Sequence, residues 1–522
     1  MSRSAFLACL LAALLPLAVA AKTLRWAAQG DVLTMDPHAQ NVITTTNVHA
    51  QIYEPLLARD KQMRLTPALA VSWTQTSPTT WMFKLRPNVK FHDGASFTAD
   101  DVIFSLARAD QPTSNFRVYA GVVASAKKLD DLTVEIATPA PNLALLYQLS
   151  FILIMNRTWC VEHNVERPQN FKDREETYAT RNSNGTGPYM LKSWQADVKT
   201  VLSKNPSWWG KWEGNVTEAV FMPIKSDATR ISALLSGEVD VVLDPPVQDI
   251  ASLKATGNLK IVEGRENRVI FLGMDQSRDE LLYSNVKGKN PFKDVRVRRA
   301  LYHAIDIEAI KSRVMRGSAE PTGTLLSAYT PAYSRDMDKR LPLDRVRAKH
   351  LLAEAGYPDG FEVTLDCPNA RYVNDEAICQ ALVAMFAQIG IRAKLDAMPP
   401  ATYFAKLQKN DTSLYMLGWG GPPGDPITTL RPVIHSPRPG GDGDFNYGRA
   451  TDPKLDELID AINVEPDAER RNAMIRDAFT LHDGEALHIP LHRQIIPWAM
   501  RSNVSVVHRP DNRLELSWTR IE

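Results

Sequence analysis

The sequence predicts an α/β fold that is divided into more than one domain. Along most of the chain, segments that alternate apolar and polar residues, typical of strands, are followed by segments whose apolar residues recur every three to four positions, typical of helices. The chain has 522 residues. Its length alone predicts about three domains, because one hydrophobic core does not grow to this size.

The run Trp81–Val102 predicts a strand, a tight turn and the start of a helix. Trp81, Phe83 and Leu85 alternate with Met82, Lys84 and Arg86, which is the period of a strand. The His-Asp-Gly sequence at 92–94 predicts a turn, since glycine takes a positive φ without steric cost. Thr98 then precedes two aspartates, and a capping hydroxyl followed by carboxylates favours a helix start.

Aspartates predict where the helices in the middle of the chain begin. Asp227 is predicted to cap a helix that ends at Gly237, and residues 239–243 should follow it as a buried strand. Asp294 is predicted to cap the next helix, which has apolar residues at i, i+3, i+4, i+7 and i+8. Asp306 is predicted to restart that helix.

Residues 344–395 predict a helix followed by a β-α-β unit. Asp344 can cap a helix that Gly356 and Pro358 end. Residues 361–365 alternate as a strand, an apolar helical stripe runs from 378 to 389, and residues 391–395 alternate again. The connection between the two strands should be right-handed, so the strands should pair in parallel.

The first 21 residues predict a signal peptide. A positive charge precedes an apolar run, Ala5–Val19, that is too short to span a bilayer, and Ala18–Ala20 fits a cleavage site. We therefore expect an exported, soluble protein in the periplasm. With 61 basic and 60 acidic residues, the chain has no electrostatic footprint for nucleic acid.

Several short segments carry little information by themselves, but their order and spacing along the chain are informative together. They are Pro67–Trp73, Trp81–Val102, Asn184–Tyr189, Lys204–Trp209, Asn290–Leu301, Gly418–Trp419, Asp425–Pro426 and Ile489–Leu491. Together they resemble the family 5 extracellular solute-binding proteins, the dipeptide, oligopeptide and nickel binders of bacterial ABC importers.

The resemblance implies a two-lobed periplasmic binding protein fold of type II, with an extra domain inserted in lobe I. Lobe I would comprise residues 22–55, 187–267 and 495–522, the extra domain 56–186, and lobe II 268–494. The protein would capture a peptide-like or anionic small solute between the lobes and deliver it to an ABC permease in the inner membrane. We expect a monomer with no cofactor and no nucleic-acid partner.

Two loops at the predicted carboxyl ends of strands are candidates for ligand binding. The first carries Arg371 and Tyr372; a guanidinium matches a carboxylate, and peptide-binding relatives place an arginine in this loop for that purpose. The second carries Trp419, Gly420 and Asp425, and the resemblance puts an aromatic residue on the cleft wall there. The last candidate contact is Asn41.

Each of the main candidates has a structural alternative. Arg371 fits a loop arginine, Trp419 fits a core residue, and Asp425 before proline fits a helix cap better than a ligand contact. Peptide-binding members carry an aspartate after the equivalent of Trp419, where it pairs with the peptide amine, but here the matching residue is Pro422. Proline has neither charge nor donor, so we expect an anionic ligand, or one whose amine is absent or blocked.

The cysteines allow two interpretations. Export to an oxidising compartment allows a disulfide between Cys367 and Cys379; alternatively, both of them and Cys160 are buried thiols. Spacing alone does not decide between the two.

Enzyme signatures are absent from the sequence. There is no G-x-S-x-G, H-E-x-x-H or Walker A motif, so a secreted hydrolase is disfavoured and we expect no catalytic residue. His482, His488 and His492 are spaced by six and four residues and do not share one helical face, which favours packing over metal binding. Delivery of the liganded form to a chemoreceptor stays open as a second binding function.

Overall fold

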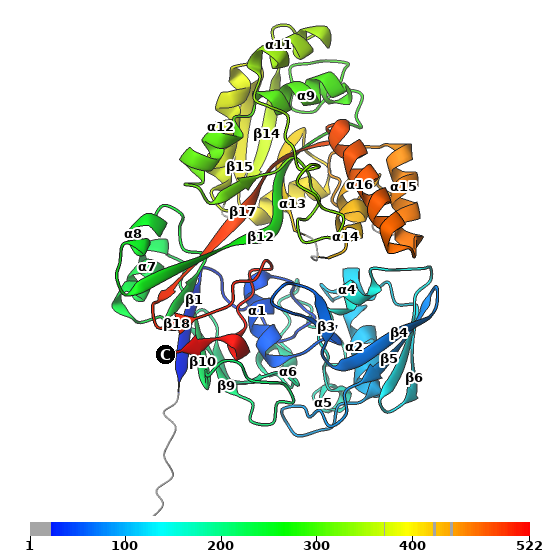
Figure 1. Ribbon diagram of the computed structural model, residues 1–522, viewed down its shortest axis with the longest axis vertical. Helices are drawn as coiled ribbons and strands as arrows, with labels where there is room; N and C mark the ends of the chain where they lie inside the picture. The colour runs from blue at the N-terminus through cyan, green and yellow to red at the C-terminus, as the bar shows by residue number, and fades with distance from the viewer. Residues whose placement is uncertain (1–21, 370, 421–423, 439–441) are drawn as a thin grey trace, which may run out of the picture.

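The computed structural model describes residues 22–369, 371–420, 424–438 and 442–522, and it has two lobes joined by two long strands (Figure 1). The two strands, β12 (Leu259–Met274) and β17 (His488–Arg501), pair antiparallel and pass from one lobe to the other. A sheet of 11 strands continues through both lobes in the order β15-β14-β16-β12-β17-β11-β1-β10-β9-β8, with β13 paired to β17. The predicted α/β class is confirmed.

Lobe I, as we use the name below, is the lower lobe of Figure 1 and contains both ends of the described chain. Within its sheet β1 pairs in parallel with β10 and β11. Its elements are β1 (Thr23–Ala28), α1 (Ile43–Ile52), α6 (Tyr178–Arg181), β8 (Tyr189–Gln195), β9 (Lys199–Lys204), β10 (Glu218–Pro223), α7 (Asp227–Ser236), β11 (Val241–Leu243), α8 (Ile250–Lys254), β18 (Val504–Ser505), η4 (Leu516–Trp518) and β19 (Arg520–Ile521).

A separate antiparallel sheet, β4-β5-β7-β6, lies beside lobe I (Figure 1) and corresponds to the expected extra domain. Phe83 of β5 and Val102 of α2 are buried in its own core. Its elements are β2 (Leu57–Arg59), β3 (Leu65–Pro67), β4 (Ala70–Ser77), β5 (Thr80–Leu85), α2 (Ala99–Ala109), α3 (Arg117–Ala120), β6 (Ser125–Asp130), β7 (Thr133–Ala137), α4 (Leu145–Leu149) and α5 (Arg157–Glu162).

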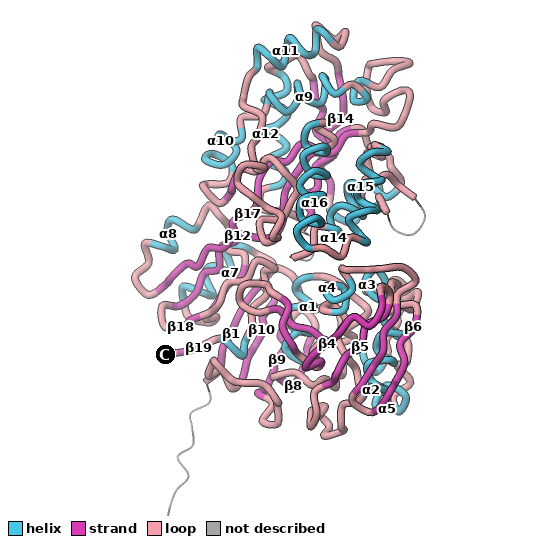
Figure 2. Tube along the Cα trace, turned by 45° about the vertical axis from the view of Figure 1, so that its right-hand side comes forward, coloured by secondary structure: helices cyan, strands magenta, loops and turns pink. Residues whose placement is uncertain are grey.

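Lobe II is the upper lobe and has helices on both faces of its strands (Figure 2). Alternation along β16 explains this: Leu414 and Met416 join one core with α9, α11 and α12, whereas Tyr415 and Leu417 join another with α13 to α16. The elements are η1 (Pro291–Lys293), α9 (Val295–Ala304), α10 (Ile307–Ala309), η2 (Ile310–Val314), β13 (Ala319–Pro321), α11 (Arg345–Glu354), β14 (Glu362–Pro368), α12 (Asp375–Ala387), β15 (Arg392–Met398), α13 (Pro400–Gln408), β16 (Leu414–Trp419), α14 (Ile427–Thr429), η3 (Leu430–Ile434), α15 (Pro453–Val464) and α16 (Ala468–Gly484).

Most of the predicted helix starts are confirmed. Thr98 forms a capping box at α2, and the side chains of Asp294, Asp306 and Asp344 each accept a backbone N–H at the start of a helix. The cap predicted at Asp227 is wrong by one residue, because the hydroxyl of Ser226 accepts the N–H of Thr229 and Asp227 is already helical.

The predicted β-α-β unit is confirmed as well. β14 and β15 pair in parallel over their whole length, and α12 connects them. The carboxyl end of β14 therefore leads into the loop that carries Arg371. The predicted signal peptide, residues 1–21, lies outside the described residues, and the residue boundaries expected for the lobes stay predictions.

Candidate ligand-binding site between the lobes

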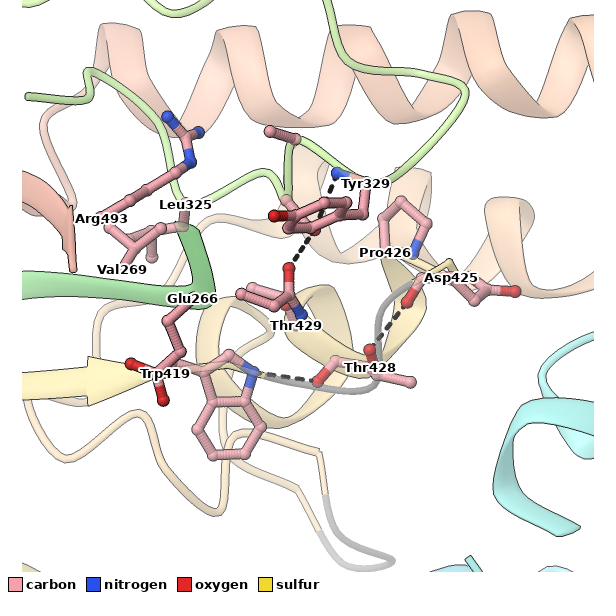
Figure 3. A pocket seen from close by; sticks show the side chains of 13 residues that line it. Glu266, Val269, Leu325, Tyr329, Trp419, Asp425, Pro426, Thr428, Thr429 and Arg493 are labelled. Carbon is pink, nitrogen blue, oxygen red and sulfur yellow. Dashed lines mark hydrogen bonds between the residues drawn. The ribbon is translucent and has the colours of Figure 1, made fainter. Parts of the chain in front are cut away.

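The crossing strand β12 changes register against β17 between Arg265 and Val269. A register shift of this kind frees residues from regular pairing and redirects their side chains. Here it presents Glu266 and Arg268 where the two lobes meet. A small pocket lies against this crossing and is lined by Glu266, Trp419 and Arg493 among others (Figure 3).

Arg371 lies in the loop after β14, and its guanidinium is available for contact with a ligand. Its backbone is fixed, because the N–H groups of Arg371 and Tyr372 donate to the carboxylate of Asp375 at 2.8 and 3.0 Å. The Arg371 side chain is exposed, lies 4.9 Å from the centroid of the Tyr372 ring, and forms no ion pair with any residue that the structure describes.

A second guanidinium approaches the same aromatic ring. Arg268 lies 5.7 Å from the ring centroid of Tyr372 and pairs with Glu266 at 3.1 Å. Although Arg371 as a whole residue is exposed, the protein around its guanidinium desolvates that group, and this effect first, followed by the charge of Arg268, lowers the pKa of Arg371 below its usual range. The two guanidinium groups repel each other, and the carboxylates of Glu266 and Asp375 act on Arg371 in the opposite direction. A ligand carboxylate at Arg371 would further relieve the repulsion between the two cations.

The Arg371 loop is tied to the rest of the protein at both ends. Cys367 and Cys379 form a disulfide with a Cα–Cα distance of 6.5 Å, so the first of the two interpretations of these cysteines describes the structure; Cys160 is a buried free thiol. The N–H of Val373 donates to Gln494 of β17 at 3.1 Å. Because Gln494 also donates to Glu266 at 2.7 Å, the loop is coupled directly to the crossing strands.

Trp419 ends β16 and lines the pocket (Figure 3). Its indole N–H donates to the carbonyl of Thr428 at 3.2 Å, and its half-buried ring lies 4.7 Å from that of Phe445. The next residue, Gly420, packs against β12, where a Cβ would lie 2.6 Å from the carbonyl oxygen of Asn267. Trp419 thus presents a ring to the pocket, whereas Gly420 permits the close approach of two chain segments.

The carboxylate of Asp425 already has partners within lobe II. Its buried carboxylate accepts the N–H of Ile427 at 3.0 Å and pairs with Arg471 at 2.9 Å. Asp425 therefore holds the chain just before α14, whose N-cap position is taken by Pro426, and a ligand amine would have to displace Arg471. Pro422, on which the expectation about a free amine was based, lies outside the described residues.

Asn41 lies apart from these residues. It is exposed just before α1, and its amide reaches the hydroxyl of Tyr119 in the extra domain at 3.5 Å. The ring of Tyr119 stacks on Phe151 at 4.6 Å. No described contact joins Asn41 to the Arg371 loop, so its assignment as a ligand contact stays a prediction.

Sequence reasoning missed Glu266 and Arg268. Their position depends on pairing with β17, more than 200 residues away in the chain. The one local signal is the charged, polar sequence Glu-Asn-Arg at 266–268, which directly precedes the apolar, fully buried half of β12.

The three C-terminal histidines lie within the core of lobe II. His482 and His488 hydrogen-bond to each other at 2.9 Å, and both are buried, as is His492. Burial lowers the pKa of His488 and of His492, the latter to about 3. The neutral, buried imidazoles of His488 and His492 fit the packing role that the spacing favours.

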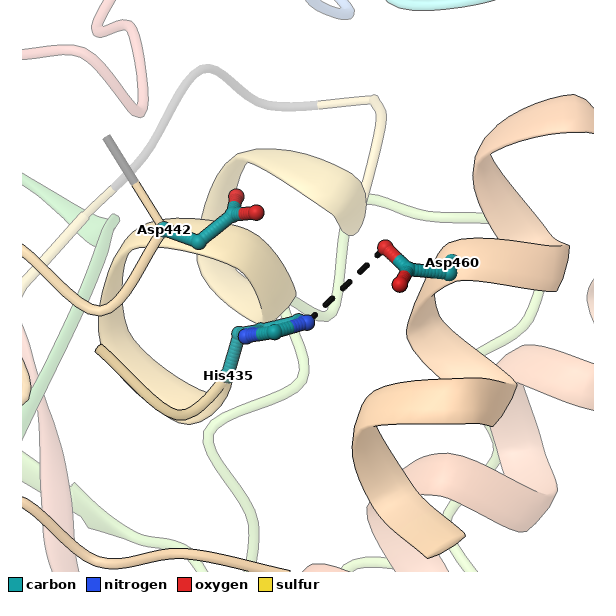
Figure 4. Close-up of side chains that lie close together, drawn as sticks. All are labelled: His435, Asp442 and Asp460. Carbon is teal, nitrogen blue, oxygen red and sulfur yellow. Dashed lines mark ion pairs between the residues drawn. The ribbon is translucent and has the colours of Figure 1, made fainter. Parts of the chain in front are cut away.

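Among the described residues there is one cluster of side chains of the types that can bind a metal ion, and it lies away from the crossing strands. It consists of His435, Asp442 and Asp460 (Figure 4). Arg431 pairs with Asp442, and Arg438 pairs with both Asp442 and Asp460. A metal ion would have to displace Arg438 from two carboxylates. The cluster is better described as an ion-pair network that joins η3 to α15.

Comparisons with known proteins agree with this architecture. A glutathione-binding protein of Salmonella paratyphi A is 27% identical over 485 residues, which is 91% of this chain and 89% of that protein. The heme-binding protein A of Haemophilus influenzae is 25% identical over 472 residues, 85% of this chain and 82% of that protein.

Solved structures share the fold. A periplasmic binding protein of Helicobacter pylori, in complex with the peptide STSA, superposes with a TM-score of 0.79 at 22% identity, covering 96% of this chain and 98% of that one. The predicted two-lobed binding-protein fold is therefore confirmed. Residues 64–441 match the family described as bacterial extracellular solute-binding proteins, family 5 Middle. Since this match covers more than half of the chain, the protein belongs to the bacterial extracellular solute-binding proteins of family 5.

Proposed function

We propose that this protein is the substrate-binding component of an ABC importer and that its solute carries a carboxylate, which Arg371 receives. The observation that carries the proposal is an exposed guanidinium that has no ion-pair partner among the described residues and lies beside a second cation at the lobe crossing. A bidentate guanidinium–carboxylate pair is both strong and geometrically specific.

The names of related proteins support a solute of this class. The Salmonella relative is named for glutathione, and the Helicobacter structure holds a short peptide; both are small molecules with carboxylates. Tyr372 and Trp419 would flank the solute with rigid aromatic surfaces, which give contact area at little entropic cost.

The remaining steps of the proposal follow from the family. The solute would bind between the lobes, rotation about β12 and β17 would close them, and the closed form would deliver the solute to an inner-membrane permease without covalent chemistry. We propose that residues 1–21 direct export to the periplasm and that the mature protein works as a monomer. Within the described residues, no helix has the length and apolar character needed to cross a membrane.

The test begins with the solute itself. Native mass spectrometry of freshly purified protein should detect a co-purified small molecule with at least one carboxylate. Titration calorimetry with that molecule, or with glutathione where none co-purifies, should then show binding that R371Q weakens tenfold or more. The control is R392Q, because Arg392 begins β15 at the opposite end of the same strands and is exposed.

Three results would contradict the proposal. They are a bound molecule without a carboxylate, equal affinity in wild-type protein and R371Q, and turnover of the solute by the purified protein. A stoichiometric complex that stays intact for hours argues for a binding protein and against an enzyme.

A further inference from the structure

The extra domain contacts lobe II directly, on the side of the molecule away from the crossing strands. Figures 1 and 2 both place α4 of the extra domain below α14 of lobe II, whereas β12 and β17 pass between the lobes on the other side. The two lobes are therefore joined by the chain itself on one side and by noncovalent contacts on the other.

Two of these contacts come from the segment that leads into α4. The side-chain amide of Asn463, near the end of α15, donates to the carbonyl of Pro141 at 3.3 Å. Ala144, which directly precedes α4, is 2% exposed and is buried in the same apolar cluster as Ile427 and Ile459 of lobe II. One hydrogen bond and one apolar contact thus cross from the extra domain to lobe II.

The third contact is made by the ring of Tyr147, within α4, on the backbone of Gly424. A Cβ built on Gly424 would lie 2.4 Å from Cε1 of this ring, so the close approach depends on glycine at that position. The guanidinium of Arg59 lies 5.5 Å from the centroid of the same ring, which ties Tyr147 to the end of β2. We call Pro141, Ala144 and Tyr147 the clasp.

The extra domain holds the clasp in place through its own contacts. The side chain of Asn142 accepts the N–H of Ala144 at 3.0 Å and donates to Gln148 at 2.8 Å, and Leu145 and Leu149 anchor α4 in the core of the extra domain. Rotation of the lobes would leave these contacts intact and break only those with lobe II. Opening would therefore expose Ala144 and remove the hydrogen bond from α15, and this cost does not depend on the solute.

We propose that the clasp stabilises the closed form of the protein, so that affinity depends on contact between the extra domain and lobe II as well as on the solute's own contacts. The inference rests on the proposed function, because it assumes closure about β12 and β17. None of the three clasp residues is among the described residues that line the pocket beside Trp419. Loss of the clasp would lower the fraction of closed protein, and with it the apparent affinity.

The test places a charge in the clasp. Ala144→Asp would bury a carboxylate against apolar residues of lobe II whenever the lobes close, which is costly for an unpaired charge. The extra domain should tolerate this change, because Ala144 is the N-cap of α4 and aspartate is favoured at N-caps. Ala140→Asp is the matched control, since it adds the same charge at an exposed position nearby. Asn463→Ala is a second variant, which removes only the amide.

Titration calorimetry uses the co-purified solute, or glutathione where none co-purifies. Ala144→Asp should bind about tenfold or more weakly than Ala140→Asp, and Asn463→Ala about threefold more weakly than the wild type. Small-angle X-ray scattering of protein freed of solute by unfolding, dialysis and refolding should give Ala144→Asp a larger radius of gyration than Ala140→Asp. Circular dichroism checks that each variant is folded.

Equal affinity of Ala144→Asp and Ala140→Asp would overturn the proposal, as would unchanged affinity of Asn463→Ala if Ala144→Asp does not fold. Where the wild type binds neither probe, the radius of gyration decides, and equal values for the two aspartate variants would overturn it. R371Q separates the two proposals. If R371Q leaves affinity unchanged while Ala144→Asp weakens it, the carboxylate assignment fails and the clasp stands; the reverse pattern leaves Arg371 in place and removes the clasp.

Discussion

Breaking the disulfide should destabilise lobe II much more than it weakens solute binding. Cys367 and Cys379 are separated by 12 residues in sequence, and in the chain-entropy model closure of a loop of this size contributes about 3 kcal/mol to the free energy of unfolding. The variant Cys379→Ala also loses one buried sulfur. Cys160→Ala is the matched control, because it removes an equally buried sulfur from a free thiol, which should cost about 1 kcal/mol.

Urea unfolding, followed by tryptophan fluorescence and circular dichroism, should therefore place Cys379→Ala about 3 kcal/mol below Cys160→Ala. Affinity for the co-purified solute should fall less than threefold, because Asp375 and Gln494 still hold the Arg371 loop through its backbone. Equal stability of the two variants would refute the entropic argument. Loss of binding with unchanged stability would show that the bond, rather than these hydrogen bonds, positions the loop.

Three further predictions concern stability. Burial lowers the pKa of His38 to about 3 and that of His49 to about 4, so between pH 6.5 and 4 only the unfolded chain binds these protons. Each histidine should therefore cost about 1.4 kcal/mol of stability per pH unit on acidification; a Tm that does not fall from pH 7.5 to 5 would contradict this. Arg108→Ala leaves the buried carboxylate of Asp36 without the ion-pair partner that lies 2.7 Å away in the wild type. It should therefore lower the free energy of unfolding, measured in urea, by about 3–5 kcal/mol. Asp425→Asn should lower Tm by removing the partner of Arg471 while calorimetry shows unchanged affinity; a tenfold loss of affinity would restore Asp425 as a ligand contact.

The elements that could be predicted from the sequence are those whose causes are local. A carboxylate before an apolar helical stripe is sufficient for a cap, and Asp294, Asp306 and Asp344 all cap as predicted. The error at Asp227 is also local, because Ser226 is an equally good cap one residue earlier. Glu266 could not be found in this way, since its position depends on the register of two strands from distant parts of the chain.

The residues of the candidate site also divide into those with a local cause and those that depend on the pairing of distant strands. Arg371 was accessible to prediction because it follows a strand within one β-α-β unit, whereas Arg268 reaches the same aromatic ring only because β12 pairs with β17. Most described charges in this protein have partners: Asp425 has Arg471, and Glu266 has Arg268. Arg371 has no ion-pair partner within the described ranges, so it can accept a solute carboxylate without the loss of an existing ion pair. A solute that is held by Arg371 in lobe II and also contacts lobe I gains affinity only when the lobes are close, so its binding energy is coupled to closure. We therefore expect R371Q to shift the lobes toward the open form in the presence of solute, which small-angle X-ray scattering would detect as a larger radius of gyration.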